Sequence, residues 1–448
     1  MKTTHILTAP LCLVLALPVC SGQTAAGTLA LGELSALIGN AHAQTAASTP
    51  QLTLDEVERI ALAENPEIHV AARKVASAEA HVPLAGALDD PQAMYRGWQV
   101  PLAKPWDYNA AQNMLMLSQS FPGRGKRGLR TNIAQSDVEM AKDDLEAARL
   151  RVRVDVRKAF FDLLRAQDDL LVHDEHVGIA QQAIEAARIK YSVGKIPQVE
   201  ILKAQVALTR LAEHMIRFDR DAEVARTHLN TLMGRQPETA IEVQGDYALE
   251  TNLPSLELLV TTAMHTRPDL AEAAAAEERS RKEENMAKKA MVPDFSVSAG
   301  YMLIPSGQSP RNNYMVEGSM SLPWLNRKKH ESEVNEATAA VSVKTAEISA
   351  LKNEALSQIE ESLADARAAQ RLAHVYQKSL KPQAAQTLHA AVVAYENDQT
   401  SFLDLLDSQM TVVDVDLATI DATADFNMKM ANLELAVGSP IAAQGVTK

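Results

Sequence analysis

Two stretches in the second half of the chain alternate apolar and polar residues with the period of a β-strand. From 294 to 303 the apolar positions are Phe295, Val297, Ala299, Tyr301 and Leu303. The alternation returns over 314–322 after a turn at 306–310, and a rougher version occupies 93–100 and 114–121. Successive side chains of a strand point to opposite faces, so these patterns predict two β-hairpins.

Each predicted strand has about ten residues, the length of a tilted transmembrane β-strand. Four strands cannot close into a barrel, and an open sheet edge is not tolerated in lipid. If the strands lie in a membrane, several copies must therefore share one barrel, with eight strands from two copies or twelve from three. Periodicity alone does not choose between them. The alternative is a soluble pair of hairpins on a helical domain.

Most of the remaining chain is typical of long helices. Residues 126–191 contain no proline, and 327–397 contain only Pro382. At a rise of 1.5 Å per residue, roughly 65 helical residues make a rod of about 100 Å. Each rod is predicted to turn at a short break, at 193–195 or 397–399, and a second helix returns over 197–233 or 401–437. A shorter helix is predicted from Thr53 to the mid-80s, with a counterpart starting near Ser255.

The two halves of the chain repeat one pattern. Matches at offsets of 201 to 204 residues pair Pro66 with Pro268, Ser120-Phe121-Pro122 with Ser321-Leu322-Pro323, Tyr191 with Tyr395, and Gly234 with Gly438. Matches in order with little drift indicate an internal duplication. We expect a first structural repeat over 44–247, a second over 248–438, and a C-terminal tail over 439–448.

The N-terminus has the pattern of an export signal. Lys2 precedes an uncharged, largely apolar run over 6–19, and Ala41-His42-Ala43 is a small-x-small cleavage site. We therefore interpret residues 1–43 as a signal peptide. The alternatives are cleavage before Cys20 with lipidation of that residue, or retention of the segment as an N-terminal helix. We expect the protein to leave the cytoplasm.

Composition excludes several classes of function. The 448 residues carry a net charge of −13, so no basic face is expected for a nucleic-acid partner. The two cysteines, Cys12 and Cys20, both lie in the N-terminal segment. The rest of the chain therefore has no disulfide framework, thiolate zinc site or cysteine nucleophile.

We find no constellation of residues that would indicate an enzyme or a bound cofactor. There is no phosphate-binding loop, His-Glu-x-x-His motif or nucleophile elbow. Gly123-Arg124-Gly125-Lys126 lacks the Walker spacing and is interpreted as a transition from strand to helix. Asp89-Asp90 lies beside a predicted strand start and needs no catalytic role. A periplasmic enzyme is the least supported interpretation.

Histidine and methionine form no clear metal-binding pattern. His173 and His176 are three residues apart on a predicted helix, without a third ligand nearby in the sequence. We interpret them as solvated helix surface, with a metal role as the alternative. The 16 methionines are scattered, which favours core packing over a copper relay.

The predicted breaks and strand ends carry motifs of a known family. These are Tyr191-Ser192-Val193-Gly194 followed by Val199-Glu200-Ile201-Leu202-Lys203-Ala204-Gln205, Tyr395 followed by Phe402-Leu403-Asp404-Leu405-Leu406-Asp407-Ser408-Gln409, and the segments 121–127 and 322–327. Over residues 52–438 the sequence resembles the TolC-like outer-membrane efflux channels. The 121–127 segment is more similar to the heavy-metal (Cus/Czc-type) branch than to the multidrug branch.

The resemblance implies a mainly α protein with a small membrane β-barrel. Family members are homotrimers that share a twelve-stranded β-barrel in the outer membrane, while a twelve-helix α-barrel with a mixed α/β belt crosses the periplasm. They are passive exit ducts for small solutes such as metal cations or drugs. Their partners are outer-membrane lipid, a periplasmic adaptor protein and an inner-membrane RND-type transporter. The alternative function is a soluble periplasmic or secreted coiled-coil scaffold or adhesin.

The resemblance also assigns roles at the two predicted breaks. The turns at Gly194 and Asp398 correspond to the tips that meet the adaptor, although the family often has glycine in both turns. The alternative is that both turns are merely helix ends. Tyr395 and Glu200 occupy positions that link neighbouring coils at the closed entrance. Thr400 stands where some relatives carry an arginine, so we expect fewer charged links and easier opening.

Asp404 and Asp407 are candidates for the pore constriction. Their spacing of three places both on one face of a helix, and by resemblance that face lines the closed entrance. Three copies would form a narrow acidic ring, in which neighbouring charges raise one another's pKa and attract cations. The alternative is that both are ordinary acids near a helix N-terminus on a solvated face.

Overall fold

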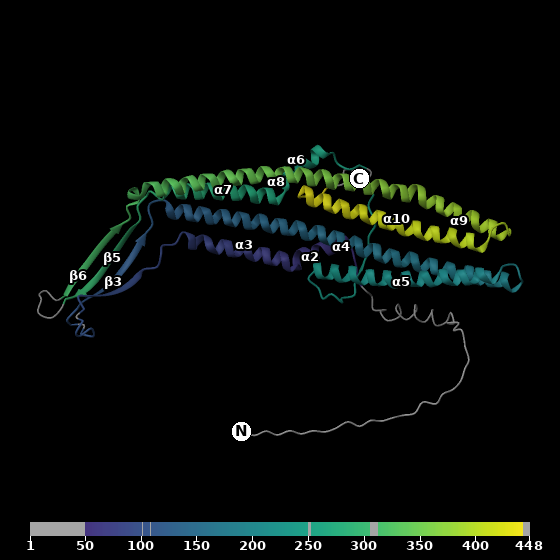
Figure 1. The fold of residues 1–448 in the computed structure, drawn as a ribbon, viewed down its shortest axis with the longest axis horizontal. Helices are drawn as coiled ribbons and strands as arrows, with labels where there is room; N and C mark the ends of the chain where they lie inside the picture. Colours follow the sequence, from purple (N-terminus) through teal and green to yellow (C-terminus); the bar gives the residue numbers. More distant parts are fainter. Residues whose placement is uncertain (1–49, 101, 108, 250–251, 305–311, 442–448) are drawn as a thin grey trace, which may run out of the picture. The chain divides into compact units, whose positions relative to one another are not determined.

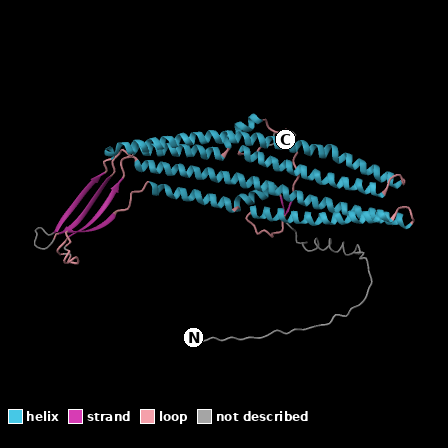
Figure 2. Ribbon diagram, viewed as in Figure 1, coloured by secondary structure: helices cyan, strands magenta, loops and turns pink. Residues whose placement is uncertain are grey.

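A computed structural model describes residues 50–441 except 101, 108, 250–251 and 305–311. The predicted signal peptide, Cys20, the turn at 306–310 and most of the C-terminal tail lie outside the described residues. Figure 1 shows the course of the chain, and Figure 2 its helices and strands.

The first long helical hairpin is as the sequence predicts. Helix α4 (Lys126–Ser192) has 67 residues, which corresponds to a length of about 100 Å. Helix α5 (Gln198–Leu232) returns along it, so the two helices lie side by side (Figure 1). The long run without proline allows α4 to continue without a break, because every interior N–H remains available to the helix.

The second long rod differs from the prediction of one continuous helix. Helix α8 (Arg327–Val375) leads into a π-helical turn at Tyr376–Leu380, and α9 (Lys381–Glu396) follows. Pro382 lies in the first turn of α9 and lacks a backbone N–H, which accounts for the change of hydrogen-bonding pattern just before it. Helix α10 (Phe402–Val437) then returns and packs against α4, α8 and α9.

The predicted helix from Thr53 to the mid-80s is two helices, so this prediction was wrong in one respect. Helix α2 (Leu54–Glu64) ends at Asn65, whose ψ of 127° is extended, and α3 (Pro66–Ala85) begins at the next residue. The proline ring disfavours a helical conformation for the preceding residue. The second repeat has the same break, between α6 (Leu256–Thr266) and α7 (Pro268–Lys289).

The four predicted long strands form one antiparallel sheet. They are β2 (Gln92–Trp98), β3 (Gln112–Phe121), β5 (Phe295–Leu303) and β6 (Asn312–Met320), in the spatial order β2-β3-β5-β6. Strands β3 and β5 are therefore central, and β2 and β6 are the edges. The short strands β1 (Gln51–Leu52) and β4 (Glu242–Val243) pair in parallel near the middle of the chain's helical part.

The register gives this sheet one apolar and one more polar face. Phe121 pairs with Phe295, which pairs with Met320, and all three side chains are substantially exposed. On the other face, serine hydroxyls of neighbouring strands bond to one another, as between Ser298 and Ser118 at 2.9 Å. Among the described residues, no helix is sufficiently long and apolar to span a membrane.

Each repeat has its own core cluster where its short first helix meets its long helices. In the first, Val57 and Ala61 of α2 pack with Phe160 and Leu163 of α4 and Leu229 of α5. In the second, the members come from α6, α8 and α10: Leu259, Ala263, Ile359, Leu363 and Leu433. The duplication expected from the sequence is thus present in the fold.

At the end of each return helix, a glycine packs closely against the backbone at the break between the two short helices of the same repeat. Gly234 has φ of +69°, and a Cβ atom there would lie 2.6 Å from the Glu64 carbonyl oxygen. Gly438 has φ of +84°, and its Cβ would lie 2.7 Å from the Arg267 Cα. Asn65 strengthens the first contact, because its Nδ2 donates to the Leu232 carbonyl at 2.8 Å. Only glycine combines this backbone conformation with such close approach.

We predict that Gly234→Ala and Gly438→Ala each lower the free energy of unfolding by about 2–4 kcal/mol, because each adds backbone strain and a steric clash. Thermal unfolding followed by circular dichroism in detergent measures the effect. Gly178→Ala is the matched control, since no atom lies within 4 Å of a Cβ at this position in α4. It should be neutral or stabilising by up to about 1 kcal/mol. Equal midpoints for all three variants would contradict the prediction.

Candidate functional site

The two tip turns have the same backbone geometry although their sequences differ. In the first, Gly194 has φ of +76° and its N–H donates to the Tyr191 carbonyl at 2.8 Å. In the second, Asp398 has φ of +55° and its N–H donates to the Tyr395 carbonyl at 3.2 Å. Aspartate is among the few residues that tolerate this left-handed conformation. Both residues are exposed at the ends of their hairpins.

Charged side chains join the two tips within one chain. The Asp398 carboxylate forms ion pairs with Lys190 Nζ at 3.2 Å and with Lys195 Nζ at 3.1 Å. These contacts hold the pKa of Asp398 below its usual value, with the hydrogen bond from Lys195 as the largest cause. Lys190 also donates to the Tyr395 carbonyl at 3.1 Å and lies 3.6 Å from the centre of the Tyr395 ring. We call Lys190, Lys195 and Asp398 the tip clamp.

The two predicted link residues, Tyr395 and Glu200, are close enough to interact electrostatically, and Tyr395 contacts Lys190 of the tip clamp. Tyr395 is buried and packs on Phe402, with 5.8 Å between ring centres. Burial raises the pKa of Tyr395, and the Glu200 carboxylate adds to the rise. Among the described residues, neither the Tyr395 hydroxyl nor Glu200 Oε2 has a hydrogen-bond partner. Each therefore retains an unused polar atom.

Asp404 and Asp407 are both exposed at the start of α10, but their surroundings differ. Asp404 Oδ2 accepts hydrogen bonds from the Ser401 N–H, the Ser401 hydroxyl and the Thr400 hydroxyl, at 2.8 to 3.2 Å. These bonds, that from the Ser401 side chain first, lower the pKa of Asp404. Asp404 thus closes a capping box. No ion pair or hydrogen bond of the Asp407 carboxylate occurs within the described part of the chain, so Asp407 is the freer charge.

The interpretation of His173 and His176 as solvated surface was wrong, because both side chains are buried. His173 Nε2 lies 3.0 Å from the Leu211 carbonyl oxygen of α5, and burial lowers the pKa of His173. His176 contacts Gln409 and Asp416 of α10, at 3.0 and 3.5 Å. These histidines connect α4 to both return helices. Within the described ranges, no three histidine, cysteine or acidic side chains are grouped so that they could hold a metal ion.

A second polar cluster, in which Asp169 is buried, was missed by sequence reasoning. Arg165 of α4 contacts Asp162 at 2.9 Å, Asp169 at 3.3 Å, and Asp421 of α10 at 3.2 Å. Asp169 is only 2% exposed, and its Oδ1 has no partner among the described residues. Burial, followed by repulsion from Asp421, raises the pKa of Asp169 to about 7 although Arg165 opposes the shift. Its sequence context, an acid beside Asp168 in a charged helix, gave no sign of this burial.

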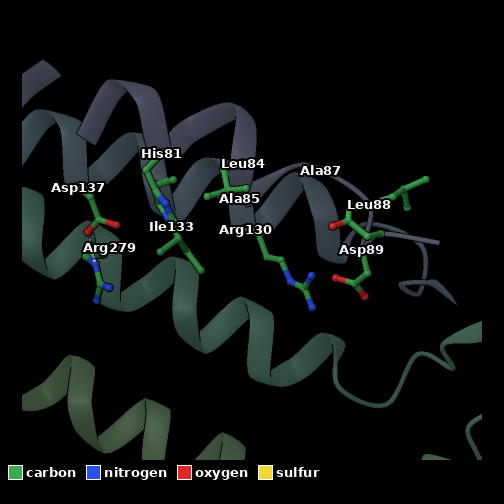
Figure 3. A pocket seen from close by; sticks show the side chains of 12 residues that line it. His81, Leu84, Ala85, Ala87, Leu88, Asp89, Arg130, Ile133, Asp137 and Arg279 are labelled. Atoms are coloured by element: carbon green, nitrogen blue, oxygen red, sulfur yellow. Dashed lines mark hydrogen bonds and ion pairs between the residues drawn. The ribbon is translucent and has the colours of Figure 1, made fainter. Parts of the chain in front are cut away.

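A shallow groove of about 600 Å³ lies where α3, α4 and α7 approach the strands (Figure 3). Its lining combines Leu84, Leu88 and Ile133 with charged residues that include Arg130, Asp89 and Asp90. On one side Arg279 donates to Asp137 at 2.6 Å, so these two charges neutralise one another. The groove contains no nucleophile activated by a neighbouring base.

The transition from β3 to α4 is confirmed as a structural feature. Gly125 has φ of +90° and immediately precedes α4. The Gly123 N–H donates to Asp294 Oδ1 at 2.6 Å, and Lys126 Nζ contacts the same oxygen at 2.8 Å. In a phosphate-binding loop such an N–H would donate to the ligand, whereas the Gly123 N–H already donates to Asp294.

The chain has two long helical hairpins and one four-stranded sheet, to which each repeat contributes two strands. This is the fold of one subunit of the TolC-like channels. The profile of the outer membrane efflux protein family matches residues 58–235 and 259–439, one match in each repeat. The chain belongs to this family. The family and the solved structures of similar fold place it in the outer membrane, with its large helical portion in the periplasm.

Named relatives agree with this assignment. The chain is 25% identical over 364 residues to the cobalt-zinc-cadmium resistance protein CzcC of Cupriavidus metallidurans, a match that covers 81% of this chain and 84% of the relative. Its fold is similar to that of the outer membrane protein VceC from Vibrio cholerae, with a TM-score of 0.70, 19% identity, and coverage of 86% and 96%. It is also similar to a crystal structure of CusC, with a TM-score of 0.72, 16% identity, and coverage of 87% and 93%.

We predict that Asp169→Asn stabilises the protein at pH 8 and has little effect near pH 4. The folded state retains the Asp169 proton up to about pH 7, whereas an unfolded chain loses it near pH 4. The stability that the protonated group contributes is therefore complete below about pH 4 and is lost as the pH rises through 7. At pH 8 the substitution should add about 2–4 kcal/mol to the free energy of unfolding.

Thermal midpoints of wild type and variant at several pH values provide the measurement. Asp174→Asn, at an exposed position of the same helix, is the control for charge removal. A gain of stability that is the same at pH 5 and pH 8 would show that Asp169 does not retain its proton in the fold.

Proposed function

We propose that this chain is the outer-membrane exit duct of a tripartite efflux pump and acts as a homotrimer. The observation that carries the proposal is the four-stranded sheet with an exposed apolar face and two open edges, joined to helices about 100 Å long. Three copies would supply twelve strands for one closed barrel, and the helices would continue the duct through the periplasm. Family membership favours this function over a soluble scaffold or adhesin.

We further propose metal cations as the exported solute. The relative with cobalt-zinc-cadmium resistance in its name supports this class of cargo. The net charge of −13 also suits a duct for cations, since an acidic lining attracts them and repels anions. Export would be passive in this chain, with the energy supplied by an RND-type transporter of the inner membrane.

The tip turns at Gly194 and Asp398 are the proposed docking surface for a periplasmic adaptor. Both turns are exposed, and no atom lies within 4 Å of a Cβ placed on Gly194. A partner backbone can thus approach closely at the first turn. At the second, Asp398 is already bound to two lysines, so we propose that an adaptor engages the two turns differently.

Asp404 and Asp407 are the proposed acidic constriction of the entrance, and Tyr395 and Glu200 the proposed links between protomers. The Tyr395 hydroxyl and Glu200 Oε2 are buried within the single chain, so a link to a neighbouring copy requires both side chains to turn outward. Capping keeps the Asp404 carboxylate ionised, and the Asp407 carboxylate has no competing partner among the described residues. Such a ring would attract cations into the entrance.

Planar-bilayer recording tests the duct and its constriction together. The purified protein should form cation-selective channels that trivalent cations block. In Asp404→Asn/Asp407→Asn, the ratio of cation to anion permeability should fall several-fold, and about tenfold more trivalent cation should be needed for half-block, because the ring loses its charge. Asp219→Asn, at an exposed position on α5, is the control. Absence of any conductance would contradict the duct, whereas unchanged selectivity would contradict only the ring.

The tip clamp is proposed to help hold the entrance closed, although Thr400 stands where some relatives carry an arginine. Asp398→Asn removes both ion pairs while asparagine still tolerates the left-handed backbone. We predict that this variant opens several-fold more often in bilayer recordings. Glu396→Gln removes the same charge from an exposed neighbouring position and should behave as wild type. Equal opening of Asp398→Asn and wild type would show that the clamp does not restrain the entrance.

A further inference from the structure

Three segments of the chain are fixed to one another where the sheet ends and the long helices begin. They are the β3–α4, α7–β5 and β6–α8 connections, and Asp294 joins them. Its carboxylate holds Gly123 and Lys126, at 2.6 and 2.8 Å. Its backbone N–H donates to the Ser321 hydroxyl at 2.8 Å, and the Ser321 N–H donates to its carbonyl at 2.9 Å. These contacts hold the three connections together at the end of the sheet.

This junction is strongly basic in an acidic chain. The stretches 121–130, 285–294 and 321–330 contain four, two and three lysines or arginines, and their one acidic residue is Asp294. The fourth connection contributes Asp89 and Asp90, so the junction retains a clear positive excess. The whole chain has a net charge of −13. Positive charge is thus concentrated where the sheet meets the long helices.

Several of these cations are not neutralised within the chain. Arg124, Lys289 and Lys328 are exposed, and none has a carboxylate partner in the described part of the chain. Arg127 donates through Nε and Nη2 to the uncharged Gly86 carbonyl, at 2.9 and 2.7 Å, so its charge also remains. We call these four residues the cationic collar. By contrast, Lys126 is paired with Asp294, and Arg327 and Lys329 at the start of α8 have glutamate partners one turn away.

An exposed apolar rim adjoins the cationic collar. The last row of the apolar sheet face, Phe121–Phe295–Met320, continues into Leu322. The short helix Pro323–Asn326 follows and presents Trp324, 49% exposed, and Leu325, 77% exposed, directly before Arg327 and Lys328. Tryptophan beside lysine and arginine is the composition that proteins place at the boundary between hydrocarbon and head groups.

We propose that the cationic collar and the apolar rim bind anionic phospholipids of the inner leaflet of the outer membrane. Trp324 and Leu325 enter the acyl region near the glycerol backbone, while Arg124, Lys289 and Lys328 contact head-group phosphates. The charges are complementary, because the unpaired cations of the collar attract an anionic leaflet that the acidic chain as a whole repels. Phosphate is also the group that arginine binds most effectively through paired hydrogen bonds.

A chain whose one tryptophan is Trp324 tests the lipid contact. The variant Trp98→Phe/Trp106→Phe is reconstituted into vesicles of phosphatidylcholine with a minor share of phosphatidylglycerol. In each sample, only one of the two lipids carries brominated acyl chains, which quench tryptophan fluorescence on contact. We expect the fluorescence of Trp324 to be quenched by both classes. At equal mole fraction, brominated phosphatidylglycerol should quench several-fold more strongly, because the collar enriches it. Absence of quenching by either lipid would mean that a neighbouring protein copy covers Trp324, and would overturn the proposal.

The collar is tested in the same background with Arg124→Gln/Lys289→Gln/Lys328→Gln. The several-fold preference for phosphatidylglycerol should be largely lost, since each basic residue near an anionic surface contributes about fivefold. Lys203→Gln/Arg210→Gln/Lys378→Gln removes three exposed charges from the long helices and should keep the preference. An equal preference in both triple variants would overturn the proposal. Bilayer conductance of each variant is recorded in parallel, so a failed lipid test is separable from a failure of the duct.

Discussion

The two open edges of the four-stranded sheet are the constraint on which the rest of this structure depends. Strands β3 and β5 are paired on both sides, whereas β2 and β6 each leave one side without a partner in the described chain. In lipid, each unpaired backbone group costs several kcal/mol. A chain of this fold can therefore be stable in the outer membrane only as part of a closed assembly. Because the β-hairpin is duplicated, each half of the chain contributes the same number of strands to such an assembly.

The helical part meets a different demand, because its rods are too long to be stabilised at one end. Each repeat has a core cluster near its short helices, and a glycine contact fastens the return helix there. Farther toward the tips, smaller apolar clusters join the hairpins, and polar contacts add to them. Arg165 reaches Asp421, His176 reaches Asp416, and Lys190 reaches Asp398. The rods are therefore held together along their length by both apolar packing and polar contacts.

Sequence patterns predicted the elements of this fold well because most of them depend on local periodicity. The alternation around Val297 predicts a strand, and the run without proline in α4 predicts a long helix. Neither prediction needs information from the rest of the chain. The offset of 204 residues also places Asp398 at the position of Gly194, and the structure gives both a positive φ. The break at Pro66 was visible in the sequence, but its effect on the helix was underestimated.

The candidate site was less predictable, because burial depends on distant partners. His173 looks solvated in its own helix, yet Leu211 and Phe218 of α5 cover it. Asp169 acquires its raised pKa through burial and through Asp421, which lies 252 residues farther along the chain. The pairing of Lys190 with Asp398 requires that the two tips be adjacent. No periodicity in one segment reports such contacts, which arise only when the two hairpins pack.

The two long rods differ in one respect that affects how they respond to force. Helix α4 is uninterrupted, whereas the second rod contains the π-helical turn Tyr376–Leu380 before Pro382. Helices kink at prolines and at π-helical turns, so the second rod is expected to bend more readily at this level. A torque applied at the tips would then be transmitted along α4 and absorbed as local curvature in the second rod. The duplicated halves are thus alike in architecture but unequal in mechanical compliance.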